Sequence, residues 1–275
     1  MTKESEAFAR VNQDGLFLVG CGKMGSALLK GWLGAGVKPA SVSVLDPNPS
    51  DWLKGLAKEG LRLNDVPEAA AVCLLAVKPQ VISDVIDLEQ LRNGGTTFVS
   101  VAAGTTLAKL AEIIGPEAAI VRSMPNTPAA IGQGITALVG NSHCDGSQLA
   151  LADVLLRTVG QTIVLDREEQ MDAVTGVSGS GPAYVFHMIE ALADAGEVEG
   201  LAPDIAMKLA IATVAGAGAL AQSAEETPKV LRENVTSPAG TTAAGLSVLM
   251  SCEDGLRPLM RGTVSAASDR SRELA

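Results

Sequence analysis

The sequence predicts an α/β fold in which a doubly wound parallel sheet is followed by a smaller all-α domain. Between residues 16 and 166, short apolar runs alternate with segments of helical periodicity, as in a parallel sheet with helices on both faces. After Asp166 no convincing strand is found, and long segments rich in Ala, Gly and Leu take over. A chain of 275 residues is long enough for two domains. We therefore expect one domain at 1–166 and an all-helical domain at 167–275.

Apolar runs mark the predicted strands of the first domain, and amphipathic runs mark the helices between them. Leu107, Leu110 and Ile114 recur at helical spacing, for example, and Gly115 with Pro116 ends that helix. The predicted strands are 16–19, 41–45, 71–77, 97–101, 119–122, 135–139 and 162–165. The predicted helices are 26–33, 52–58, 81–86, 107–114 and 148–157.

Three apolar segments of the second domain are predicted to be helices, at 182–195, 203–223 and 242–251. Pro182 and Pro203 stand where two of them begin, and proline is favoured in the first turn of a helix. The absence of strand patterns around them indicates a domain made of helices alone.

Small residues at helical spacing suggest that these helices cross closely, either in a core or at a dimer interface. Because only 19% of the residues are charged, we expect much of the surface to be covered, and we favour a homodimer through the helical domain. The most apolar stretch, Leu209 to Ala221, is shorter than the ~20 residues of a membrane span, so we expect a buried helix there. The small residues are Ala212, Ala215, Gly216 and Ala219.

The charge balance excludes some classes of function. Lys and Arg total 21 and Asp and Glu total 31, which gives a formal net charge of −10. An acidic chain repels phosphate backbones and anionic lipids, so we expect neither a nucleic-acid partner nor a membrane partner. The four cysteines are far apart and form no CxxC pair, so we expect no metal site and no disulfide framework. Together with polar first residues that lack a leader pattern, this indicates a reduced, cytoplasmic protein.

Residues 20–25, Gly-Cys-Gly-Lys-Met-Gly, form a GxGxxG motif that directly follows the first predicted strand and opens a helix. Gly20 permits the tight turn, Gly22 lets the main chain approach a pyrophosphate, and Gly25 lets the helix pack on the strand. Free N–H groups and the positive end of the helix dipole then hold the phosphates. In this context the motif predicts a Rossmann-like domain that binds a dinucleotide.

Asp46 ends the second predicted strand, where such domains carry an acidic residue. A carboxylate there bonds the ribose hydroxyls of NAD and repels the 2′-phosphate of NADP. No Arg is nearby, so this position favours NADH. One alternative is that Asp46 only caps the next helix, and Asn48 and Ser50 could still bond a phosphate.

Further segments end predicted strands, which is where ligands bind in open α/β sheets. Lys78 could send its ammonium group towards a phosphate, while Pro79 begins the following helix; Lys78 could equally be a solvated surface lysine. The small side chains of Ala102-Ala103-Gly104 would allow a nicotinamide to come close. Asn126, in a loop stiffened by two prolines, offers both a donor and an acceptor to the cofactor.

Two glycine-rich loops of the helical half, 178–184 and 235–242, place small hydroxyl side chains where helices begin. A helix N-terminus with free N–H groups can hold a carboxylate. Plain helix capping is the alternative for either loop, but two such loops in one domain favour an anion pocket.

Taken together, these segments resemble the pyrroline-5-carboxylate reductases. The resemblance covers nearly the whole chain from about residue 16, in the family's order and spacing. It implies a Rossmann domain followed by a helical dimerisation domain, often assembled further into rings of dimers. It also implies reduction of Δ1-pyrroline-5-carboxylate, a cyclic imine, to L-proline by NADPH or NADH, the last step of proline biosynthesis. The motifs are GCGKMG (20–25), AVKP (76–79), AAG (102–104), MPNTP (124–128), SGSGPAY (178–184) and NVTSPAGTT (234–242).

The resemblance also assigns roles to residues of this sequence. The loop from Ser237 to Thr242 would hold the substrate carboxylate through backbone N–H groups and the Ser237 hydroxyl. Thr242 would hydrogen-bond the ring nitrogen as the catalytic residue, with Glu225 assisting nearby. The implied substrate set is Glu225, Ser237, Gly240, Thr241 and Thr242. The implied cofactor set is Gly20, Cys21, Gly22, Lys23, Met24, Gly25, Asn64, Ala76, Val77, Lys78, Pro79, Ala102, Ala103 and Gly104.

One departure from the family concerns the cofactor. Many members place Ser or Arg after the second strand, whereas this chain has Asp46. The NADPH preference common in bacterial members is therefore in doubt for this chain.

Two other functions fit parts of the sequence. A β-hydroxyacid dehydrogenase has the same two-domain plan but needs a lysine shortly after the glycine-rich segment at 178–184. The only lysines after Asp166 are Lys208 and Lys229, and neither follows that segment. His187 could replace such a lysine as an acid, but a single His on an apolar helix is more often structural. A non-catalytic dinucleotide sensor would not need the paired anion loops.

Overall fold

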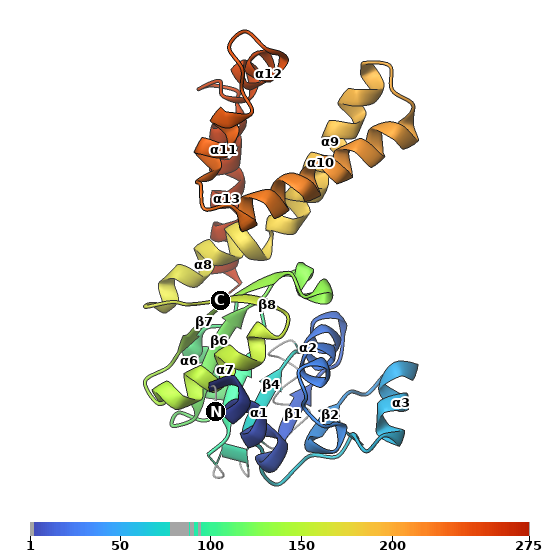
Figure 1. Cartoon of the computed structure of the whole chain (residues 1–275). Helices are drawn as coiled ribbons and strands as arrows, with labels where there is room; N and C mark the ends of the chain where they lie inside the picture. Colours follow the sequence, from blue (N-terminus) through green and yellow to red (C-terminus); the bar gives the residue numbers. More distant parts are fainter. Residues whose placement is uncertain (1–2, 78–87, 89–90, 93–94, 275) are drawn as a thin grey trace. The chain divides into compact units, whose positions relative to one another are not determined.

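The computed structural model describes residues 3–77, 88, 91–92 and 95–274, and it divides into two compact units (Figure 1). The first unit is Met1–Gly179 together with Ala267–Ala275, and the second is Ser180–Ala266. The division falls later in the chain than Asp166, and the end of the chain belongs to the first unit.

The first unit is built on one sheet with the strand order β3-β2-β1-β4-β5-β6-β7-β8. The chain runs outwards from β1 through β2 to β3, then returns to the other side of β1 at β4, which is the doubly wound arrangement. The predicted fold class is thereby confirmed. The strands are β1 Leu16–Val19, β2 Val42–Leu45, β3 Arg62–Leu63, β4 Val72–Leu75, β5 Thr97–Ser100, β6 Ala119–Met124, β7 Gly134–Gly140 and β8 Gly160–Val164.

One strand departs from the predicted parallel order. β7 pairs with β6 in an antiparallel sense, and β8 then pairs with β7 in a parallel sense. The connection from β6 to β7 contains only a short 3₁₀ helix, η2 (Thr127–Ile131). A parallel crossover needs about a dozen residues or more, so this link can only return the chain in the opposite direction.

Helices cover both faces of the sheet. Leu16 and Leu18 of β1 belong to one buried apolar cluster, and Phe17 and Val19 belong to another. Both faces of β1 are therefore buried, as expected for a central parallel strand. The predicted helix at 81–86 lies outside the described residues. The helices of this unit are α1 Lys3–Asp14, α2 Lys23–Gly34, α3 Asp51–Lys58, α6 Leu107–Ile114, α7 Gly146–Arg157 and α8 Met171–Val174.

In the second unit, Ser180–Ala266, the described regular elements are all helices. α9 and α10 pack against each other through the buried Ala193, Ala206 and Ala210. A Cβ atom on Gly196 would lie 3.4 Å from the Cβ of Ala206, so small residues permit this close approach. Pro182 and Pro203 occupy first-turn positions, as predicted. The helices are α9 Gly181–Val198, α10 Pro203–Ser223, α11 Pro228–Asn234, α12 Thr241–Leu249 and α13 Leu256–Glu273, whose end belongs to the first unit.

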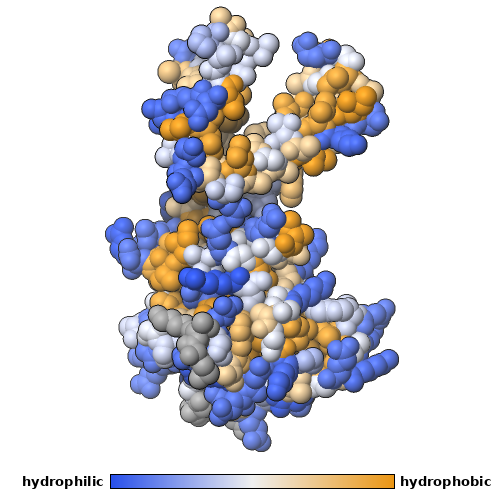
Figure 2. All heavy atoms as spheres, in the orientation of Figure 1, coloured by the Kyte–Doolittle hydropathy of each residue, from blue (hydrophilic) through white to orange (hydrophobic). Residues whose placement is uncertain are grey.

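Much of α10 is exposed within a single chain, which corrects the expectation of a buried helix. Figure 2 shows apolar side chains at the surface of the α9–α10 pair, and Leu209 and Leu220 are 52% and 55% exposed. Ala212, Ala215, Gly216 and Ala219 are also exposed, so the predicted close crossing does not use them within one chain. Among the described helices, α10 is long and apolar enough to span a membrane by length and composition alone.

Candidate active site

The carboxyl ends of the central strands lie in register. Val19 of β1 pairs with Leu45 of β2 and with Leu75 of β4, and Leu75 pairs with Ser100 of β5. Because ligands of doubly wound sheets bind at this edge, next to the strands where the chain changes direction, the residues just beyond these strands form the candidate site. The fold thus brings together Gly20, Asp46, Ala76 and Ala102, which are far apart in the sequence.

The three glycines of the 20–25 loop differ in what a side chain at each position would meet. Gly20 has a φ of +87°, and a Cβ there would lie 2.4 Å from Val77. A Cβ on Gly25 would lie 2.2 Å from the carbonyl oxygen of Gly20. A Cβ on Gly22, in contrast, would meet no protein atom within 4 Å. Gly20 and Gly25 are therefore required by the fold, whereas the space beside Gly22 is free for a ligand.

Gly22 also caps α2 without any side-chain hydrogen bond to the first N–H groups of that helix. Lys23 is exposed and Met24 is half-buried in the first turn. Unsatisfied N–H groups at the positive end of a helix bind anions. These features fit the pyrophosphate of a dinucleotide.

The carboxylate of Asp46 is held by backbone donors. Its Oδ2 accepts a hydrogen bond from the N–H of Cys21 at 2.8 Å, and its Oδ1 accepts one from the N–H of Asn48 at 2.8 Å. The N–H of Asp46 donates to Oδ1 of Asn64 at 2.9 Å. The alternative that Asp46 caps the next helix is wrong, because Ser50 is the N-cap of α3 and accepts from Leu53. Asp46 instead ties the end of β2 to the glycine loop.

Cys21 is buried within this loop, and its main chain carries the contact to Asp46. Burial raises the pKa of the Cys21 thiol, and the nearby Asp46 carboxylate raises it further, while a side-chain contact with Ser26 lowers it. The thiol therefore stays protonated near neutral pH, so it offers packing to this site rather than a nucleophile.

Other expected cofactor residues complete this edge of the sheet. Asn64 is exposed and has a φ of 57°, a left-handed conformation that Asn tolerates better than most residues. Ala76 and Val77 are half-buried just after β4. Lys78 and Pro79 lie outside the described residues. A dinucleotide along this edge would meet small or backbone groups rather than bulky side chains.

The loop after β5 is compact at the position where a nicotinamide is expected. Ala102 is half-buried, Ala103 is exposed, and Gly104 is buried with a φ of +73°. On the neighbouring segment, Oδ1 of Asn126 accepts from the N–H of Ile135 at 3.0 Å, and its Nδ2 donates to Ser178 Oγ at 3.4 Å. Asn126 thus has partners for both ends of its amide within the protein.

The first predicted anion loop is not a free helix start. Residues Thr175–Gly179 form a π-helical turn, and α9 follows directly, with Ser180 at its N-cap in helical backbone geometry. The exposed N–H groups expected at 178–184 are therefore fewer than the sequence suggested. A Cβ on Gly179 would lie 2.3 Å from Met124, so this glycine is required by packing.

The second predicted anion loop does begin a helix, within the second unit. Gly240 is the N-cap of α12, and no side chain caps the first turn. The N–H of Gly240 donates to the carbonyl of Ser237 at 3.1 Å, which closes a turn around Ala239, whose φ is 57°. Ser237, Thr241 and Thr242 are exposed. This turn leaves hydroxyl and N–H donors open, as a carboxylate site requires.

Sequence reasoning missed Glu168, which lies in the 3₁₀ helix η3 (Glu168–Gln170) and contacts the start of α6. Glu168 accepts a hydrogen bond from the N–H of Leu107, which is 61 positions earlier in the chain, and no periodicity or motif connects these two residues.

Comparison with protein families gives two matches. The family model described as pyrroline-5-carboxylate reductase dimerisation matches residues 168–274. The model described as NADP oxidoreductase, coenzyme F420-dependent, matches residues 16–104.

Curated relatives and solved structures resemble the chain over most of its length. A pyrroline-5-carboxylate reductase of Pseudomonas aeruginosa is 38% identical, covering 94% of this chain and 95% of that protein. One from Pisum sativum is 39% identical over 94% of this chain and 96% of the relative. The structure of a pyrroline-5-carboxylate reductase from Coxiella burnetii superposes with a TM-score of 0.87 at 34% identity, covering 95% of this chain and 98% of that one. The Plasmodium falciparum enzyme, described with NADP bound, gives 0.78 at 28% identity, with coverages of 95% and 98%.

Proposed function

This chain belongs to the pyrroline-5-carboxylate reductase family, and from that premise we propose that it reduces Δ1-pyrroline-5-carboxylate to L-proline with NAD(P)H, the last step of proline biosynthesis. The observation that carries the proposal is the full-length similarity to curated reductases of this one activity. The open space beside Gly22 and the uncapped start of α2 support it, because they fit a dinucleotide.

The reaction needs little chemical activation from the protein. When bound, NAD(P)H supplies a hydride to the imine carbon, and the electron pair of the C=N bond moves to the nitrogen. A protonated imine is already electrophilic, so orientation can supply much of the rate, equivalent to roughly 7–11 kcal/mol for well-placed reactants. A site made of backbone N–H groups and hydroxyls suits this task.

We assign separate tasks to the two sets of residues. The glycine loop and Asp46 hold the dinucleotide, with Asn64, Ala76, Val77, Lys78 and Pro79 alongside, and Ala102–Gly104 and Asn126 accommodate its nicotinamide end. In the helical domain, Ser237, Gly240 and Thr241 hold the substrate carboxylate. Thr242 orients the ring nitrogen, and Glu225 assists there. The nitrogen's proton comes from solvent or is already present.

Assembly follows from the helical half of the chain. Residues 168–274 match a dimerisation family, so the chain forms a homo-oligomer through its helical domain. We further propose that dimers join into a ring, and that the enzyme works in the cytoplasm without a nucleic-acid or membrane partner. The four free cysteines, two of them buried, support a reducing compartment.

The test is an assay with purified protein, Δ1-pyrroline-5-carboxylate and either NADH or NADPH. We expect loss of reduced-nicotinamide absorbance and equal formation of proline. No loss with either cofactor would overturn the proposal. A series of β-hydroxyacids with the oxidised cofactors serves as the control, and we expect no turnover with them.

A further inference from the structure

The loop between β5 and α6, residues 101–106, is fixed at its start by the sheet. The N–H of Val101 donates to the carbonyl of Leu75 at 3.1 Å, and the N–H of Ala102 donates to Ser100 Oγ at 3.2 Å. The Ser100 carbonyl in turn accepts from Ser123 Oγ at 2.8 Å. The first residues of the loop therefore follow the edge of the sheet.

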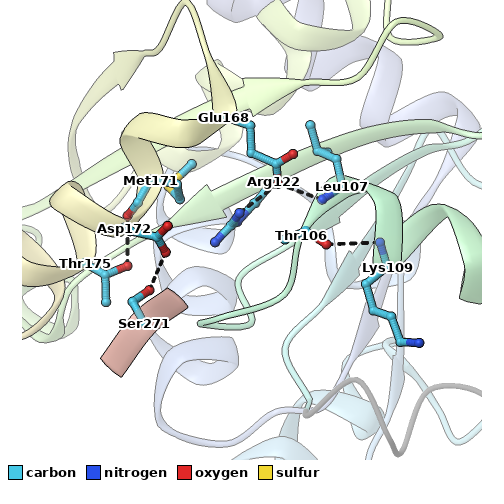
Figure 3. Close-up of polar contacts among 9 residues, drawn as sticks. All are labelled: Thr106, Leu107, Lys109, Arg122, Glu168, Met171, Asp172, Thr175 and Ser271. Atoms are coloured by element: carbon cyan, nitrogen blue, oxygen red, sulfur yellow. Dashed lines mark hydrogen bonds and ion pairs between the residues drawn. The ribbon is translucent and has the colours of Figure 1, made fainter. Parts of the chain in front are cut away.

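The far end of the same loop is held by a residue from much later in the chain. Oε1 of Glu168 accepts a hydrogen bond from the N–H of Leu107, the first residue of α6, at 2.7 Å (Figure 3). The same oxygen accepts from the guanidinium of Arg122 in β6, also at 2.7 Å. The side chain of Arg122 is 5% exposed and that of Glu168 is 27% exposed. One carboxylate oxygen thus joins the end of the loop to the central sheet.

Glu168 is not the N-cap residue of α6. Thr106 is already the N-cap, and its hydroxyl accepts from the N–H of Lys109 at 3.2 Å (Figure 3). The N–H groups of the first helical turn have no partner within their own helix, so a carboxylate beside them is favourable. What Glu168 adds is a fixed position of Leu107 relative to Arg122, and hence to β6.

The middle of the loop meets the end of the chain. A Cβ on Gly104 would lie 3.0 Å from the Cβ of Leu274, so the main chain of the loop packs directly on this residue. Nearby in sequence, Ser271 is buried, and its Oγ donates to Oδ1 of Asp172 at 2.7 Å (Figure 3). The loop is therefore enclosed at its start, middle and end.

We propose that Glu168 is a positioning residue that holds loop 101–106, through Leu107 and Arg122, in the conformation that receives the nicotinamide. This rests on the proposed function, in which Ala102–Gly104 lie at the nicotinamide end of the cofactor. Glu168 acts through Leu107 and Arg122 and not by contact with cofactor or substrate. Its effect is confined to the part of the cofactor that the loop meets, and the adenine end, held by Gly20–Gly25 and Asp46, is independent of it.

The test compares Glu168→Ala with Glu169→Ala, a matched control at the next, exposed residue of η3. Dissociation constants are measured for NADH, NADPH, ADP-ribose and its 2′-phosphate derivative. The last two ligands lack nicotinamide. For Glu168→Ala we expect the reduced dinucleotides to bind roughly five- to tenfold more weakly, as for the loss of one ordinary hydrogen bond, with ADP-ribose binding unchanged. The control should match the wild type for all four ligands.

A second variant, Glu168→Gln, guards against loss of folding. It keeps an oxygen that can accept from Leu107 but loses the charge facing Arg122. We expect it to recover most of the dinucleotide affinity lost in Glu168→Ala. If Glu168→Gln lost as much dinucleotide affinity as Glu168→Ala, the proposal would be overturned. Equal weakening of NADH and ADP-ribose binding in either variant would indicate a purely structural role instead. Unchanged NADH binding in Glu168→Ala would also overturn the proposal. Since no imine is used, failure of the reductase assay leaves this result readable on its own.

Discussion

Both carboxylate oxygens of Asp46 accept hydrogen bonds from main-chain N–H groups. One donor is Cys21 of the glycine loop, and the other is Asn48. The negative charge of Asp46 is therefore fixed at the end of β2 rather than free to turn away. A fixed charge at this place would repel the 2′-phosphate that distinguishes NADPH from NADH. We propose that Asp46 governs the choice between NADH and NADPH in this chain.

We predict a preference for NADH that Asp46→Asn reduces. Asn keeps the shape and an acceptor oxygen but removes the charge that repels a 2′-phosphate. At about 5 Å and an effective dielectric constant between 20 and 80 that repulsion is about 1–3 kcal/mol, so the ratio of kcat/KM for NADH to that for NADPH should fall by roughly 5- to 150-fold. Asp51→Asn, on the exposed first turn of α3, is the control. A wild type that prefers NADPH, or a ratio that Asp46→Asn leaves unchanged, would contradict this prediction.

Thr242 is predicted to act on the substrate alone. Replacing it with Ala removes the hydroxyl proposed to orient the ring nitrogen, and loss of such a hydrogen bond lowers kcat by roughly 10- to 100-fold. Binding of NADH, measured by its fluorescence, should not change. Ser247→Ala is a matched control, because Ser247 is exposed on the same helix and donates to the carbonyl of Ala244. Unchanged turnover in Thr242→Ala would remove this residue from the mechanism.

At the scale of one element, the loop that precedes α2 contains one glycine required for folding and another available for cofactor binding. Gly25 faces the carbonyl of Gly20, whereas Gly22 faces empty space. Gly25→Ala should destabilise the protein by about 1–3 kcal/mol or more, as overpacked sites do, and lower its thermal unfolding temperature. Gly22→Ala should lower that temperature much less, because its methyl group meets no protein atom and only the N-cap preference for glycine is lost. NADH binding should weaken roughly tenfold, since the methyl group enters the pyrophosphate path. Equal effects of both variants on stability would refute this distinction.

Elements with a clear apolar period could be predicted, and those without one could not. α6 matches its predicted bounds, because Leu110 and Ile114 of its apolar face are buried. α13 was missed: it is rich in charged side chains, and the residues it buries are Ser268 and Ser271. A polar helix whose buried residues are serines has no hydrophobic periodicity from which it could be predicted.

The same limit applies to the candidate site. The glycine loop could be predicted because its residues are contiguous and their backbone requirements are strict. The contact of Glu168 with Leu107 could not, because it depends on how distant strands and helices pack. The antiparallel direction of β7 could not be predicted from its apolar pattern either, because that pattern is the same for a parallel and an antiparallel strand. The short link through η2 determines that β7 runs antiparallel to β6.

At the scale of the whole molecule, the exposed apolar side chains of α9 and α10 lead to a prediction about assembly. Leu209→Glu places a charge on a residue that the dimer is expected to cover, so we expect dissociation into monomers at micromolar concentration, measured by light scattering after size exclusion. Gln222→Glu adds the same charge at the exposed end of α10 and should remain oligomeric. A Leu209→Glu protein with the wild-type mass would show that this face of α10 is not part of the interface.

The first compact unit is not continuous along the chain: it takes up Ala267–Ala275 after the whole of the second unit has intervened. On the ribosome, the residues that pack on Gly104 and Asp172 emerge only after the helices of the second unit have been made. A nascent chain that has only the central strands lacks Leu274, which packs on Gly104, and Ser271, which donates to Asp172. The residues that enclose loop 101–106 are therefore made after α12, the helix that carries Thr242.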